Sequence, residues 1–155
     1  MREQHGAVVL PVPTTRVWKF VTEVRCWPAW LQPVSTVRAL TLPKTAAGMR
    51  FEVVRSRQPT VETWIVAEWD APSHVRFTEY RQNIQLAFAV LPAGPEAELR
   101  VRLAYPRPRG LLSNLTVRLT VGGGWAKGLE ASCTPLHAIF VANRDLFLLH
   151  NLDGA

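Results

Sequence analysis

Cysteine is scarce in this sequence, which argues against a domain held together by disulfides or zinc. Cys26 and Cys133 are the only two cysteines among 155 residues, and neither belongs to a CxxC pair or stands near paired histidines. We therefore expect neither a metal ion nor another cofactor. The first residues, MREQHGAVVLPVP, carry no apolar export signal, so we expect a reducing, cytoplasmic compartment and two buried thiols.

Long apolar runs and long charged runs are also missing. No stretch reaches the ~18 uninterrupted apolar residues that a membrane-spanning helix needs, so the sequence predicts no membrane span. Apolar residues make up 48% of the chain and charged residues 19%, a balance that excludes a disordered protein. The length suits one hydrophobic core, so residues 1–155 are expected to form a single domain.

Basic side chains exceed acidic ones by 18 to 12, which gives a formal net charge of +6. The excess is spread over both halves of the chain and forms no basic tail. This charge permits binding to nucleic acid or to a ribosome but does not demand it. The densest basic stretch contains Arg100, Arg102, Arg107 and Arg109, and it would form an arginine-rich outer face.

The first third of the chain predicts a strand followed by two short helices. Residues 4–12 are expected to form the strand, and the apolar spacing over residues 14–24 predicts the first helix. Pro28 suits the first turn of a second helix over residues 29–31, because proline's missing N–H has no partner to lose there. Pro33 is expected to end this helix.

From residue 34 to residue 105 the apolar residues recur with a period of two, which predicts strands. We expect strands over residues 35–42, 49–54, 61–69, 75–80, 84–90 and 99–105. Short turns, such as the one at residues 70–73, join neighbouring strands. The sheet is therefore predicted to be an antiparallel meander, with Arg100 and Arg102 on its solvent side.

The C-terminal third is predicted to supply the helix that covers this sheet. Residues 111–121 are expected to form one helix and residues 125–150 a longer one, with the glycines at 122–124 between them as a hinge that could gate a cavity. Pro135 should kink the long helix or mark its start. Residues 138–142 are apolar nearly all round, which predicts burial on more than one side.

Five stretches together carry a family pattern. They are PTTRVWKFVT at residues 13–22, RCWPAW at 25–30, GMRF at 48–51, TWIVAEWDAP at 63–72 and the alternating strand at 97–105. Their order and spacing resemble the START/Bet v 1-like (SRPBCC) superfamily, in particular its polyketide cyclase/dehydrase-like branch. The resemblance implies an α+β helix-grip fold. In that fold a curved antiparallel seven-stranded sheet wraps around a long C-terminal helix, with two short helices after strand 1.

The resemblance also implies an apolar cavity between the sheet and the C-terminal helix. We expect the protein to bind a small hydrophobic, aromatic or polyketide-like ligand or a lipid there, as a monomer or a homodimer. Whether it also has cyclase or dehydratase activity stays open, because the family shares no catalytic residue set. We expect the cavity to be lined by Phe51, Trp64, Phe77, Phe88, Val101, Leu103 and Phe140, with Arg55, Glu79 and Tyr105 as its polar groups.

Several alternatives remain open at this stage. Arg55 and Glu79 fall on otherwise apolar faces. They either pair or meet a polar ligand group inside the cavity, or they lie at strand ends in water, and we favour the strand ends. Simple alternation puts Trp64 and Trp69 on opposite faces. Simple polarity favours Trp69 inward, whereas the resemblance favours Trp64 inward, and we favour Trp64. A different class of function is a ribosome- or protein-interacting module that uses the arginine-rich face. A histidine of the last helix paired with Asn143 would be an acid/base candidate.

Overall fold

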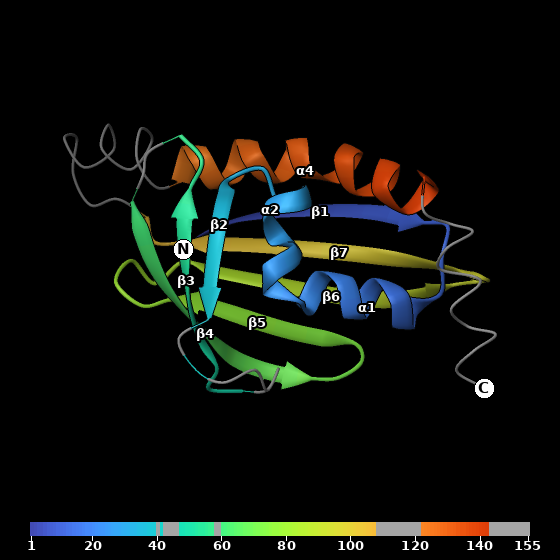
Figure 1. Ribbon diagram of the computed structural model, residues 1–155, viewed down its shortest axis with the longest axis horizontal. Coiled ribbons are helices and arrows are strands. Elements are labelled where there is room, and N and C mark those ends of the chain that lie inside the picture. The colour runs from blue at the N-terminus through green and yellow to red at the C-terminus, as the bar shows by residue number, and fades with distance from the viewer. Residues whose placement is uncertain (40, 42–46, 58–59, 108–121, 143–155) are drawn as a thin grey trace.

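The computed structural model describes residues 1–39, 41, 47–57, 60–107 and 122–142 of the chain (Figure 1). Within these residues one antiparallel sheet has the strand order β1-β7-β6-β5-β4-β3-β2. Its strands are β1 (Arg2–Leu10), β2 (Val34–Ala39), β3 (Arg50–Arg55), β4 (Val61–Asp70), β5 (His74–Glu79), β6 (Gln85–Ala93) and β7 (Glu96–Tyr105). Each strand from β2 to β6 pairs with the next one along the chain, so the predicted meander is confirmed.

The helices lie along the sheet on the face that carries the buried side chains. They are α1 (Thr14–Thr22), the 3-10 turn η1 (Val24–Cys26), α2 (Trp27–Trp30) and α4 (Gly122–Ala142). Pro28 stands in the first turn of α2, as predicted. The helix α1 packs on β6 and β7, and α4 packs on β1 and β7 (Figure 1). The curved sheet and its long C-terminal helix form the expected α+β helix-grip arrangement.

The structure changes three expectations about α4. The triple glycine belongs to α4, which is described from Gly122, so these glycines are helical; the helix expected at residues 111–121 lies outside the described residues. Pro135 lies inside α4 rather than at its start. In residues 138–142 only Phe140 is buried, so the expected burial on several sides was wrong. No helix of the described segments has the length and apolarity to cross a bilayer.

A β-bulge in β4 decides the orientation of two tryptophans. Val66 pairs with Phe77 and Glu68 pairs with Arg76, which leaves Ala67 without a partner in β5. The extra residue shifts the alternation by one, so residues on both sides of it can face the interior. Trp64 is fully buried, and Trp69 packs on Trp18 of α1 with ring centroids 5.1 Å apart. The predicted inward position of Trp64 is confirmed, and Trp69 faces inward as well.

Candidate functional site

Four of the predicted lining residues lie together in the interior, packed around Trp27 of α2. The ring centroids of Phe51, Trp64, Phe77 and Phe88 lie 5.3, 6.4, 4.9 and 6.0 Å from that of Trp27. All four contacts are close to perpendicular, an arrangement that aromatic rings favour. The Nε1–H of Trp27 donates to the carbonyl oxygen of Val21 at 2.9 Å, which fixes the ring. The sequence did not single out Trp27 as the centre of this cluster.

The remaining apolar candidates extend the same buried layer. Val101 and Leu103 of β7 and Phe140 of α4 are all buried. The ring of Phe140 lies 5.2 Å from that of Phe20 on α1, so it joins the two helices. Tyr105 ends β7 and is half-buried. The role of these side chains in lining a cavity remains a prediction.

Arg55, at the end of β3, forms a buried ion pair with Glu62 of β4. Its Nη1 lies 3.1 Å from Oε1 of Glu62, and the two side chains are only 9% and 7% exposed. The other carboxylate oxygen, Oε2, accepts a hydrogen bond from Nε1 of Trp64 at 3.1 Å. The guanidinium carbon of Arg55 also lies 4.9 Å from the ring centroid of Trp125 on α4. Charge, hydrogen bond and cation–π contact therefore meet at one point of the interior.

Glu79, at the end of β5, is buried too. Its side chain is 1% exposed and accepts a hydrogen bond from the backbone N–H of Gln82. The strand-end position in water that we favoured for Arg55 and Glu79 was therefore wrong. The reason lies in what covers each strand end: Trp125 covers Arg55, and the turn after β5 folds back over Glu79, where Asn83 donates to its carbonyl.

Burial has opposite effects on the two partners of the ion pair. It raises the pKa of the Glu62 carboxyl above its usual value, although the charge of Arg55 and the hydrogen bond from Trp64 oppose the rise. It lowers the pKa of the Arg55 guanidinium, which the attraction to Glu62 opposes. Both shifts have the same cause, because a low-dielectric interior penalises each charged form. The pair is stable only as long as both partners are present.

Two buried indole N–H groups have no hydrogen-bond acceptor in the described part of the chain. They are the Nε1 groups of Trp30 and Trp125. The two side chains are 2% and 1% exposed, so bulk solvent does not reach these donors. The ring of Trp30 lies 5.6 Å from Phe88, and that of Trp125 lies 5.2 Å from Trp64. Each open donor thus stands beside a ring that the sequence predicted to touch a ligand.

The other sequence-based candidates do not assemble into a site within the described residues. His137 of α4 is exposed, whereas Asn143 and His150 lie outside the described residues, so their predicted acid/base pairing has no test here. The side chains of Arg100, Arg102 and Arg107 are exposed, as the arginine-rich face requires. Arg109 again lies outside the described residues.

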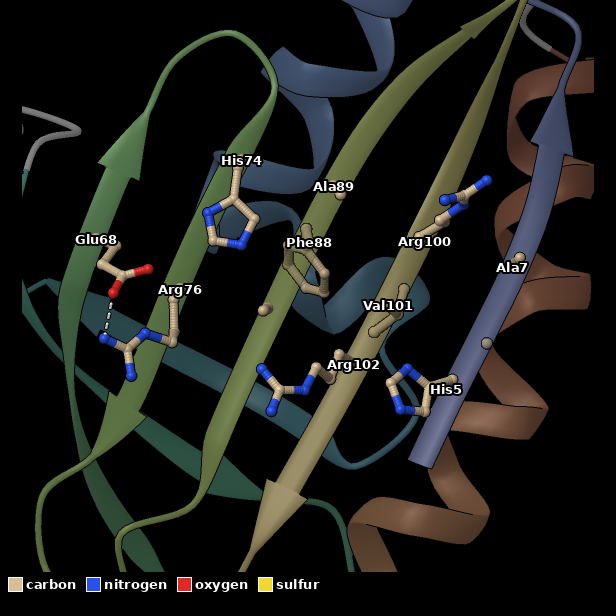
Figure 2. A pocket seen from close by; sticks show the side chains of 12 residues that line it. His5, Ala7, Glu68, His74, Arg76, Phe88, Ala89, Arg100, Val101 and Arg102 are labelled. Carbon is tan, nitrogen blue, oxygen red and sulfur yellow. Dashed lines mark hydrogen bonds and ion pairs between the residues drawn. The ribbon is translucent and has the colours of Figure 1, made fainter. Parts of the chain in front are cut away.

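The hollow that the structure describes lies on the outer face of the sheet, with the helices behind it (Figure 2). It has a volume of about 570 Å³ and is lined from β1, β4, β5, β6 and β7. The cavity that the sequence predicted would instead lie on the inner face, between the sheet and α4. That inner cavity remains a prediction.

The comparison with protein families assigns this chain. Residues 1–132 match the family model described as polyketide cyclase / dehydrase and lipid transport, so the chain belongs to that family. No curated protein matches the chain. The predicted relationship to the polyketide cyclase/dehydrase branch is therefore confirmed.

Solved structures share the fold at low sequence identity. TTHA0849 from Thermus thermophilus is 18% identical, with a TM-score of 0.70 over 91% of this chain and 98% of that one. Ms6760 from Mycobacterium smegmatis is 12% identical, with a TM-score of 0.64 over 91% of this chain and 92% of that one. The di-domain ARO/CYC protein BexL, from the BE-7585A biosynthetic pathway, is 20% identical, with a TM-score of 0.59 over 84% of this chain and 46% of its own. These matches support the helix-grip fold.

Proposed function

We propose that the protein binds a flat hydrophobic molecule that carries a hydrogen-bond acceptor, between the sheet and α4. The observation that supports this most directly is the pair of open donors, Nε1 of Trp30 and Nε1 of Trp125. A buried N–H without an acceptor costs roughly 1–3 kcal/mol. A ligand carbonyl or ether oxygen would remove that cost at either position, so the interior selects for ligands that carry such an atom.

The Trp125 end of the interior is suited to the polar part of such a ligand. Arg55 lies over the Trp125 ring, and Glu62 keeps the guanidinium in place. A ligand oxygen at this end would meet an indole donor beside a fixed positive charge. The rings around Trp27 would contact the flat apolar part. This division into an apolar body and a few polar groups is typical of small-molecule sites.

Because the rings around Trp27 touch one another, the ligand must displace side chains as it binds. Contacts between these side chains are replaced by contacts with the ligand. The favourable free energy of binding therefore comes only from the additional apolar area that is removed from water. At ~25 cal/mol per Å², ~200 Å² of additional burial contributes about 5 kcal/mol. Taken alone, that gain corresponds to a dissociation constant of about 0.2 mM. The ligand's hydrogen bonds add to it, and the cost of ordering side chains is subtracted from it.

A matched pair of ligands tests the proposal. Fluorenone and fluorene have nearly the same shape, but only fluorenone has a carbonyl oxygen. We expect fluorenone to quench tryptophan fluorescence at about tenfold lower concentration than fluorene, because only its oxygen can accept from a buried indole. Trp30→Phe and Trp125→Phe each remove one donor, and at least one of them should abolish the preference.

Trp69→Phe is the control variant, since the indole of Trp69 packs on Trp18 and is not one of the open donors. It should keep the preference for fluorenone. Equal affinity for the two compounds, or no binding of either, would contradict the proposal. Native mass spectrometry of freshly purified protein provides an independent check. A co-purified hydrophobic compound that carries oxygen is the expected result.

A further inference from the structure

The hollow on the outer face has a floor of small residues between two walls that carry arginine and histidine side chains. Ala89 of β6 lies on the floor (Figure 2). Ala87 lines the hollow from the same strand, between Arg76 and Arg102 in the register. On one side stand His74 and Arg76 of β5, and on the other stand Arg100 and Arg102 of β7, with His5 of β1 beyond them. The strand register explains this arrangement. Outward-facing positions of neighbouring strands lie side by side, and the central strand carries only methyl groups.

Two rows of paired residues cross the hollow. The first row runs Glu68, Arg76, Ala87, Arg102, His5, each paired with the next across neighbouring strands. The second row runs His74, Ala89, Arg100, Ala7. Because neighbouring strands are ~4.8 Å apart, the backbones at Arg76 and Arg102 stand about 10 Å apart with Ala87 between them. The hollow therefore presents two guanidinium-bearing walls on either side of a flat apolar floor.

Positive charge is in excess among the residues that line the hollow, which include three arginines and one glutamate. Arg76 contacts Glu68 through Nη2 and Gln85 through Nη1, and its buried Nε–H has no acceptor among the described residues. Arg102 contacts Glu3 at the margin, and both of these side chains are more than 40% exposed. The Arg102–Glu3 pair is exposed and therefore weak in water, so it leaves Arg102 available to a second acidic partner.

We propose that this outer-face hollow binds a small organic anion with a flat body and an acidic group at each end. The body lies on Ala87 and Ala89, and the acidic groups meet Arg76 on one side and Arg102 on the other. Arg100 and the two histidines add hydrogen-bond donors along the walls. Carboxylate, sulfonate and phosphate groups all share the chemistry that a guanidinium recognises. This site is separate from the interior site of the proposed function, because it lies on the opposite face of the sheet.

The shape of the hollow favours a small molecule over a nucleic acid. Its volume of about 570 Å³ lies within the range of small-molecule sites. A nucleic-acid surface instead needs a longer basic track, with aromatic side chains for stacking if the strand is single.

The probe for this proposal is naphthalene-2,6-disulfonate, a flat molecule with an acidic group at each end, titrated into 15N-labelled protein at low salt. Amide shifts should concentrate at residues 74–76, 87–89 and 100–102. Arg102→Ala should weaken binding about tenfold or more, because it removes one charge-assisted contact. Ala89→Leu changes no charge but fills the floor, and it should weaken binding as well. Inorganic sulfate, which cannot span the walls, should bind more weakly than the disulfonate.

Arg38→Ala is the matched control, because Arg38 is an exposed arginine on β2, paired with Glu52, and does not line the hollow. It changes the net charge by the same amount as Arg102→Ala and should leave binding unchanged. Equal weakening by the two variants, or unaffected binding in Ala89→Leu, would mean general charge attraction and overturn the proposal. Binding of a short RNA with steep salt dependence, without binding of the disulfonate, would also overturn it and identify a nucleic-acid surface.

Discussion

The variant Arg55→Met tests how much the buried ion pair between Arg55 and Glu62 contributes to the stability of the protein. In Arg55→Met the aliphatic part of the side chain is kept, but Glu62 loses its partner while it remains about as buried as before. Breaking a buried pair from one side costs about 3–5 kcal/mol. For a domain of this size, that corresponds to a fall in melting temperature of about 6–20 °C. Chemical denaturation and thermal unfolding would both measure the loss.

The same variant should show a pH dependence with a definite sign. Burial already raises the pKa of Glu62 in the folded protein, and removal of the Arg55 charge raises it further. The folded state then holds this proton more tightly than the unfolded state does. The stabilisation that this bound proton contributes is therefore fully present below the usual carboxyl pKa. It is lost as the pH rises through the raised pKa of Glu62 in the folded protein. The deficit of Arg55→Met relative to the wild type should be smaller at acidic pH than at neutral pH.

Two further variants test whether loss of the buried ion pair causes the loss of stability. Arg38→Met breaks the exposed pair with Glu52, in which Arg38 is 72% exposed, and should cost only about 0–1 kcal/mol. The double variant Arg55→Met/Glu62→Leu removes both charges and should recover much of the stability lost in the single variant. If Arg55→Met were no less stable than Arg38→Met, or if the double variant were no better than Arg55→Met, the ion pair would not be the cause.

Three further predictions concern packing and thiol chemistry. A methyl group at Gly128 would lie 2.3 Å from Cγ of Pro33, which is too close for two carbon atoms. We therefore expect Gly128→Ala to lower the free energy of unfolding by about 1–2 kcal/mol, although alanine favours helices more than glycine does. A variant more stable than the wild type would refute this. Trp27→Ala should cost about 3–5 kcal/mol in urea titrations, and a loss under about 1 kcal/mol would mean that the ring cluster repacks. Cys26 and Cys133 are half-buried rather than fully buried as expected, and this burial still raises the pKa of both thiols. Both should therefore react more slowly with Ellman's reagent at mildly alkaline pH than in the unfolded chain; equal rates would contradict the shift.

Those parts of the fold that depend on local pattern could be predicted from the sequence. Period-two alternation located β3 to β7, and short turns fixed the meander, because hairpin neighbours pair directly. Pro28 located α2 for an equally local reason. The inward position of Trp64 also followed, although the resemblance rather than the alternation decided it.

Features that depend on distant segments could not be predicted. The burial of Arg55 depends on Trp125, which stands 70 positions later in the chain, and alternation along β3 contains no information about it. The bulge at Ala67 adds one residue to β4 without a glycine to signal it. The outer hollow needs the register of β5, β6 and β7 together, because only their alignment puts Ala87 between Arg76 and Arg102.

Pairing of β1 with β7 means that the first described strand of the sheet waits during synthesis for the last described one. More than half of the chain is synthesised between Leu10 and Glu96. Until then β1 presents unpaired backbone groups that could pair with a strand of another nascent chain. Such long-range closure is slow to form. The hairpins from β2 to β7 should therefore assemble during synthesis, with β1 docking afterwards to complete the sheet.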